Sequence, residues 1–336
     1  MDQLNTQVLL FQHLKSILPQ HLSMADEVAD LLEISPDSAY RRIRGEKPIT
    51  LEELEKVCVR YNISMDQFLH LKSNSFLFSG ILREEKERSF DDWLDHLMKQ
   101  LSFMNTLTNK RLYWLLKDIP PISHFQIPEL ARFKFFLWTK SILHYTSMRG
   151  VKFDLKDSRY DAYEEKSRKV LELFNNIPIT EIWNVESINS SLRQIKFHHE
   201  AGSFRSKEDA LIVFDRMYDL INHYEQQAES GVKFLYGTKP AGSKTEYNMF
   251  VNELILGDNT TLFETDNLRV TFLNHSVLYF VSTRDPRFNE LMFENLQNLM
   301  QKSTMISKVG EKERATFFNR LRAETDSRRK EIFNGS

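Results

Sequence analysis

Residues 23–54 read SMADEVADLLEISPDSAYRRIRGEKPITLEEL, and this stretch contains two signals for the start of a helix. Ser23 stands three residues before an aspartate, so its hydroxyl can cap the free amides of a first helical turn. Ser35 precedes a proline, which loses no hydrogen bond at the first position of a helix. Gly45 predicts the end of that second helix. The stretch therefore predicts two short helices that follow each other closely.

Similar signals extend this pattern in both directions. Residues 4–18 carry apolar side chains at three- and four-residue steps, which predicts an amphipathic helix before the quoted stretch. Two capping pairs, in which Ser or Thr precedes Glu or Gln by three residues, predict further helices at residues 51–61 and 65–70. Five short helices are thus expected within residues 1–72.

This N-terminal segment resembles the Cro-like phage-repressor (Xre-type) helix-turn-helix domain over residues 4–70. The stretches that carry the resemblance are VADLLEIS at 28–35, AYRRIRG at 39–45, ITLEEL at 49–54 and YNISMDQFL at 61–69. Glu33 departs from the family pattern, which usually has glycine in the turn. The resemblance implies a DNA-binding domain whose helix after Ser35 enters the major groove.

The resemblance also implies which residues read the bases, because the family places them on early solvent-facing positions of this helix. Those positions are Pro36, Asp37, Tyr40 and Arg41, with Ser38 as a polar neighbour. The period of the α-helix indicates a similar face, independently of the resemblance. If Ala39 and Ile43 face inward, the opposite side of the helix is free to contact a partner. The residues on that side are Asp37, Tyr40, Arg41 and Arg44.

The side chains on this face have the chemistry to bind double-stranded DNA. An arginine can donate to both acceptors on the edge of a guanine, so Arg41 is the best candidate for a base contact. Asp37 can accept a hydrogen bond from cytosine. Arg42, Arg44 and Lys47 are expected to contact phosphate groups.

The charge of the segment leaves a second interpretation open. Residues 1–72 contain eight Lys and Arg against eleven Asp and Glu, a net charge of -3. Residues 35–48 contain four basic and two acidic side chains, a local charge of +2, and phosphate attraction depends on charge within a Debye length of about 8 Å. The arginines could nevertheless do no more than solvate a surface helix. The helix-turn-helix pattern favours DNA contact.

The rest of the chain is expected to form two further parts after a linker. Residues 73–80 are the expected linker, because the stretch around them is Ser-rich and lies between helical patterns. Residues 81–230 predict a helical domain, with breaks at proline and glycine. The expected helices are 90–106, 110–119, 128–148, 162–175, 180–201 and 207–228.

Residues 231–336 show a change of period and predict a small sheet with two helices. Apolar and polar residues alternate, and turn residues separate the stretches 246–256, 260–264 and 276–282, with Leu268, Val270 and Phe272 between them. Helices are expected at 285–302 and 311–333. The predicted class is mainly α with a small antiparallel β-meander near the C-terminus (α+β), and this last part is expected to serve sensing or dimerisation.

The predicted C-terminal helix carries an apolar stripe. Phe317, Phe318 and Leu321 lie at helical spacing, whereas its other faces are charged. Such a stripe must be buried against the sheet or against a second subunit. We expect the second subunit, because a long, charged terminal helix can extend away from a core.

Composition excludes several classes of protein. The chain has 336 residues, 41% hydrophobic and 27% charged, with a net charge of -2, which is typical of a soluble globular protein. Cys58 is the only cysteine and cannot form an intrachain disulfide, which favours a reducing compartment. The N-terminus lacks a signal-peptide pattern, and no stretch reaches the roughly 18 apolar residues of a membrane span. A cytoplasmic protein without membrane contact is expected.

Two short motifs resemble catalytic or binding sites without meeting their chemical requirements. Residues 237–245 nearly match a phosphate-binding P-loop, but one extra residue precedes the lysine and a strand pattern follows it. His198 and His199 are adjacent, and neighbouring helical positions point about 100° apart, too far to hold one metal ion. No catalytic serine or dinucleotide motif occurs. We therefore expect no enzyme activity, no cofactor and no metal.

These observations predict a sequence-specific DNA-binding transcriptional regulator. A homodimer is expected, because one recognition helix reads too few base pairs for useful selectivity. The part beyond residue 80 could bind a small-molecule or peptide effector, or serve only to dimerise. The alternative is a protein-interaction adaptor whose helix-turn-helix fold does not bind DNA, and the acidic balance of residues 1–72 supports it.

Overall fold

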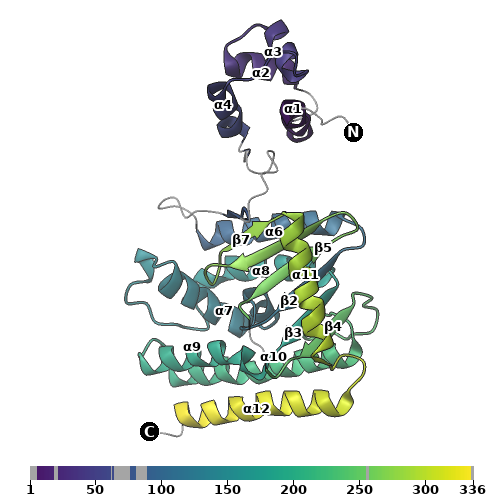
Figure 1. Ribbon diagram of the computed structural model, residues 1–336. Coiled ribbons are helices and arrows are strands. Elements are labelled where there is room, and N and C mark those ends of the chain that lie inside the picture. Colours follow the sequence, from purple (N-terminus) through teal and green to yellow (C-terminus); the bar gives the residue numbers. More distant parts are fainter. Residues whose placement is uncertain are drawn as a thin grey trace. The chain divides into compact units, whose positions relative to one another are not determined.

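The computed structural model describes residues 6–18, 22–61, 63, 76–80, 89–254 and 257–333. The chain divides into two compact units, Met1–Leu77 and Phe78–Ser336 (Figure 1). Their boundary falls inside the stretch predicted as a linker. Each unit has its own hydrophobic core.

The N-terminal unit contains four described helices, α1 (Thr6–Ile17), α2 (Met24–Leu32), α3 (Pro36–Ile43) and α4 (Leu51–Tyr61). The predicted caps are confirmed at Ser23 and Ser35, whose hydroxyls accept from the amides of Asp26 at 3.4 Å and Ser38 at 3.3 Å. The buried side chains at the centre include Leu10, Phe11, Leu14, Val28, Ala39 and Val57. The predicted fifth helix at 65–70 lies outside the described residues.

The second unit is built on one eight-stranded sheet with the order β1-β7-β6-β5-β2-β3-β4-β8. Strands β2, β3 and β4 are parallel to one another, and every other pairing is antiparallel. The strands are β1 (Ser79–Gly80), β2 (Arg111–Leu115), β3 (Ile179–Trp183), β4 (Tyr247–Val251), β5 (Thr260–Glu264), β6 (Arg269–Asn274), β7 (Phe280–Thr283) and β8 (Thr304–Met305).

Helices pack on both faces of this sheet. Alternate strand residues divide between the faces: Tyr113 and Leu115 pack with Leu296 of α11, whereas Leu112 and Trp114 join the main core. The helices of this unit are α6 (Phe90–Thr106), α7 (Pro128–Leu137), α8 (Asp161–Asn175), α9 (Asn189–Glu200), α10 (Lys207–Ser230), α11 (Pro286–Gln301) and α12 (Glu311–Phe333). Figure 1 shows α11 alone across the near face of the sheet.

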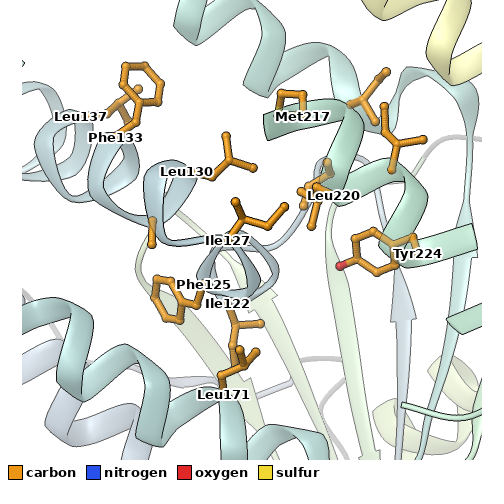
Figure 2. Close-up of a cluster of buried hydrophobic side chains, with 14 of the residues drawn as sticks. Ile122, Phe125, Ile127, Leu130, Phe133, Leu137, Leu171, Met217, Leu220 and Tyr224 are labelled. Carbon is orange, nitrogen blue, oxygen red and sulfur yellow. The ribbon is translucent and has the colours of Figure 1, made fainter. Parts of the chain in front are cut away.

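Aromatic and aliphatic side chains fill the main core. Figure 2 shows part of it, where Leu130 of α7 lies near Leu220 of α10. Phe125 of the short 3-10 helix Pro121–Gln126 and Leu171 of α8 lie in the same cluster. The aromatic residues Phe133, Phe135, Phe136 and Trp138 are buried in this core.

The overall class is confirmed as mainly helical with a C-terminal sheet rich in antiparallel pairs, but two helix predictions are wrong. Residues 110–119 contain β2, and residues 180–201 contain most of β3, followed by α9. Both strands are short apolar runs, which periodicity alone cannot distinguish from buried helix. Every residue of Ile179–Trp183 is buried, as expected of a central parallel strand.

The predicted separation of 81–230 from 231–336 differs from the structure. Strands β5, β6 and β7 form the expected antiparallel meander, but β4 pairs in parallel with β3, and β5 pairs with β2. One sheet therefore contains strands from both stretches. The edges of β2 and β3 find their hydrogen-bond partners in β5 and β4, which belong to residues 231–336.

The C-terminal helix packs on other helices of its own chain. Its apolar stripe is therefore buried neither against the sheet nor against a second subunit, the two alternatives that the sequence suggested. Phe317, Phe318 and Leu321 are buried, and α12 packs against α10 and α9 rather than against the meander or a free face. These three helices lie side by side in Figure 1. The apolar stripe is thus part of the main core.

We expect Phe318→Ala to lower the free energy of unfolding of the second unit by about 3 to 5 kcal/mol, because it leaves a cavity at a fully buried position. Urea denaturation followed by tryptophan fluorescence measures this unit, since all four tryptophans belong to it. Lys312→Ala, at an exposed position of the same helix, should change the value by less than about 0.5 kcal/mol. Equal effects from both variants would contradict the packing described.

Candidate nucleic-acid interface

The turn between α2 and α3 is tight and internally hydrogen-bonded. Glu33 adopts a left-handed conformation (φ 57°, ψ 43°), which glycine adopts more readily. The amide of Ile34 donates to the carbonyl of Ala29 at 3.0 Å, and the amide of Glu33 donates to that of Asp30 at 3.3 Å. The turn therefore keeps helix-turn-helix geometry with glutamate at the position where the Cro-like family usually has glycine.

The outer face of α3 presents the side chains expected to contact a partner. Ala39 is fully buried and Ile43 is half-buried, so the opposite side of the helix faces solvent. The predicted residues exposed there are Pro36, Asp37, Tyr40, Arg41 and Arg44, with Ser38 half-buried beside them and Lys47 exposed after the helix.

The two exposed arginines differ in their surroundings. No acidic side chain of the described residues forms an ion pair with Arg41. The Arg44 guanidinium lies 6.0 Å from the centre of the Tyr40 ring and 3.8 Å from a carboxylate oxygen of Glu46. That pair is well exposed and contributes little, so both arginines can exchange water for a phosphate or a base edge.

Arg42 corrects one of the predicted phosphate contacts. Its side chain is buried, and its Nε and Nη2 groups donate to the two carboxylate oxygens of Glu53 at 2.9 and 2.6 Å. In a third hydrogen bond, Nη1 donates to the carbonyl oxygen of Ser38 at 3.2 Å. Arg42 thus joins α3 to α4 and is not available to DNA. Arg42 lies three residues after buried Ala39, so the period of the helix places it on the inner side, beside Ile43.

Gln7 is a positioning residue that sequence patterns did not reveal. Its amide nitrogen donates to the carbonyls of Arg42 at 2.6 Å and Lys47 at 2.8 Å, and its side-chain oxygen accepts from the amide of Ile49 at 3.0 Å. These bonds tie α1 to the end of α3 and to the turn that follows it. No local signal marks Gln7, because its partners lie at least 35 residues away.

The P-loop-like stretch at residues 237–245 and the adjacent His198 and His199 have the local geometry that the sequence predicts. Residues 237–245 lead into strand β4, not into the helix that a P-loop requires. The ring of His198 packs on Phe136, whereas that of His199 lies 5.0 Å from Phe333. Within the described ranges, no group of three His, Cys, Asp or Glu side chains is arranged to hold a metal ion.

None of the described helices has an apolar stretch that is long enough to span a lipid bilayer.

We expect Glu53→Gln to loosen α3 and α4, because it removes the charge that pairs with buried Arg42. Hydrogen exchange measured by mass spectrometry should show faster exchange in both helices, equivalent to about 2 kcal/mol of local opening free energy. Glu52→Gln removes the same charge at an exposed neighbouring position and should leave exchange nearly unchanged. Equal acceleration by both variants would refute the role of the pair.

The same pair predicts a pH dependence. The side-chain hydrogen bonds from Arg42 lower the pKa of Glu53 below its ordinary value of 4.5. Its stabilisation is therefore fully present above about pH 4.5 and is lost as the pH falls through the lowered pKa. Exchange in α3 and α4, corrected for the intrinsic rate, should accelerate over that acid range in the parent protein, and less in Glu53→Gln. Identical acid profiles would count against this assignment.

Comparison with protein families supports the helix-turn-helix geometry. Residues 11–85 match the BetR domain family. No curated protein matches the chain. The match confirms a helix-turn-helix-type domain at the N-terminus, and it does not specify the Cro-like phage-repressor type.

Proposed function

We propose that the chain is a transcriptional regulator that binds double-stranded DNA sequence-specifically as a homodimer, and that it acts by binding rather than by catalysis. The observation that carries the proposal is the division of α3 into two faces. Arg42 anchors the inner face to Glu53, while Arg41 and Arg44 are exposed on the outer face. The expected location is the cytoplasm.

The outer face of α3 suits the major groove. Arg41 is exposed and free of acidic partners among the described residues, so it can donate two hydrogen bonds to a guanine. Asp37, one turn earlier, can accept from a cytosine. Arg44 and Lys47 lie at the other end of the helix and after it, where they can contact phosphate.

The anchoring of α3 supports selectivity. A recognition helix discriminates between bases only when its side chains are held in a defined register. The Arg42–Glu53 pair ties α3 to α4, and the three bonds of Gln7 tie the end of α3 and the following turn to α1. Little conformational freedom then remains to be lost when DNA binds.

A homodimer can recognise a longer DNA sequence than a single chain can. One α3 helix can reach only a few base pairs, whereas two related copies can read half-sites about one helical turn apart. In this proposal the second unit forms the dimer contact or receives an effector, a small molecule or a peptide.

A second candidate function is a protein-interaction adaptor whose helix-turn-helix unit does not bind DNA. The net charge of -3 over residues 1–72 favours it. So does α4, where Leu51 and Val59 are 79% and 76% exposed and could contact another protein.

Two arginine variants test the reading of DNA. Against a duplex selected from a random library, Arg41→Ala should weaken binding by about 1 to 3 kcal/mol and relax the preferred sequence, since a base contact is lost. Arg44→Ala should weaken all sequences similarly and reduce the salt slope by about 1, since a phosphate contact is lost. Fluorescence anisotropy across a salt series measures both effects.

The control is Arg60→Ala, which removes the same charge from an exposed position on α4. It should change affinity much less than either α3 variant. Equal, sequence-independent losses from Arg41→Ala and Arg44→Ala would reject the division between base and phosphate. Affinity that does not fall with salt would favour the adaptor.

The dimer is tested on the full chain. Sedimentation velocity at the concentration that saturates the selected duplex should give two chains per duplex. A duplex with one half-site scrambled should bind substantially more weakly, because the second subunit can then contact its half-site only non-specifically. One chain per duplex, with no loss from the scrambled half-site, would rule the dimer out.

A further inference from the structure

The second unit contains a cavity of about 850 Å³ between the sheet and α6. Its volume lies in the range of small-molecule sites, about 300 to 1,000 Å³. Strand register explains its floor: Trp114, Thr261, Phe272, Ser282 and Ser79 pair in turn across β2, β5, β6, β7 and β1. Directly paired residues point to the same face of a sheet, and all five line the cavity.

The opposite wall is supplied by α6. Trp93, Leu97, Leu101 and Met104 recur at helical spacing and line the cavity. Phe174 of α8 extends the aromatic surface, because its ring stacks on Trp114 with centres 5.2 Å apart. The walls are therefore mostly apolar and partly aromatic, which suits an apolar ligand body.

The acidic groups at the edge of the cavity already have partners. A carboxylate oxygen of Asp92 accepts from the amide of Ser89 at 2.9 Å and caps α6. Asp95 pairs with Lys166 at 2.8 Å. The basic side chains in the lining, His96 and Lys99, are exposed and remain hydrated. A charged ligand group would lose its hydration in this cavity without gaining a buried counter-charge.

Neutral polar groups remain for recognition. The amide of Gln100 and the hydroxyl of Thr261 line the cavity, and neither has a hydrogen-bond partner among the described residues. Each can donate and accept. They complement a hydroxyl or carbonyl group on an otherwise apolar molecule.

We propose that this cavity is a binding site for a neutral, mostly apolar small molecule that carries one hydroxyl or carbonyl group. The floor of the site ends on β1, which directly follows the N-terminal unit in the chain and pairs only with β7 among the described strands. A bound molecule adds contacts to that short edge strand and stabilises its pairing. That the molecule is the effector of a DNA-binding regulator rests on the function proposed above.

The test uses the full chain without DNA, so its outcome is independent of DNA binding. N-phenyl-1-naphthylamine, a neutral probe that fluoresces in apolar sites, should bind with one site per chain. Competitors of equal chain length then define the ligand class: decanol, decanoate and decylammonium. Decanol should displace the probe at about tenfold lower concentration than either ion, since a tenfold ratio corresponds to about 1.4 kcal/mol of charge desolvation.

Thr261→Phe places an aromatic ring on the cavity floor and should weaken probe binding at least about tenfold. The matched control Thr316→Phe, at an exposed position on α12 outside the cavity, should bind as the parent does. Both variants should retain the parent melting temperature. If Thr261→Phe lowers it, Gln100→Trp on α6 provides a second way to fill the same cavity.

Hydrogen exchange with saturating decanol gives an additional readout. Peptides that contain β1 and β7 should exchange more slowly, because the ligand lies on the row that joins them. Several results would overturn the proposal: no saturable probe binding, equal binding by the cavity-filling variants, or displacement by decanoate or decylammonium as effective as by decanol. Unchanged exchange in β1 would overturn its stabilisation by the ligand.

Discussion

The ion pair between Arg42 and Glu53 is the constraint on which the exposed face of the N-terminal unit depends. It makes two hydrogen bonds, at 2.9 and 2.6 Å, between helices that are otherwise joined by a short turn. A buried guanidinium without a partner would be costly, so the pair restricts the rotation of α3 about its axis. With Arg42 inward, helical geometry directs Arg41 and Arg44 outward, which makes one surface of this small unit suitable for binding.

The second unit is organised around one sheet whose two faces are covered differently. One face packs in the main core, and the other packs with α11. The parallel strands β2, β3 and β4 lie between β5 and the edge strand β8 and need helical crossovers, which supply most of the main core. The meander β5–β7 extends the sheet beyond that helical layer. The cavity lies along this extension, so its shape follows from strand order and register. The proposed ligand site and the proposed DNA-binding surface thus lie on separately packed parts of one chain.

Local chemistry explains which features could be predicted. Caps at Ser23 and Ser35 act over three residues, so the starts of α2 and α3 could be predicted from their neighbours. The inner and outer faces of α3 follow from a period of 3.6 residues. The predicted phosphate contact of Arg42 is wrong because this charged residue, on an inner position, pairs with Glu53, 11 positions away. The helices predicted over β2 and β3 are wrong because short apolar runs satisfy both periods.

The sequence by itself determined the elements whose stabilising contacts are local: the capped helices of the N-terminal unit, their exposed basic side chains and the turns of the meander. Only the tertiary structure decided the pairing of Arg42 with Glu53, the role of Gln7, the parallel pairing of β3 with β4 and the packing of α12 on α10. These contacts join residues distant in sequence, and many partners could satisfy the same side chain. The choice among them depends on how the whole unit buries its apolar surface, which no local pattern encodes.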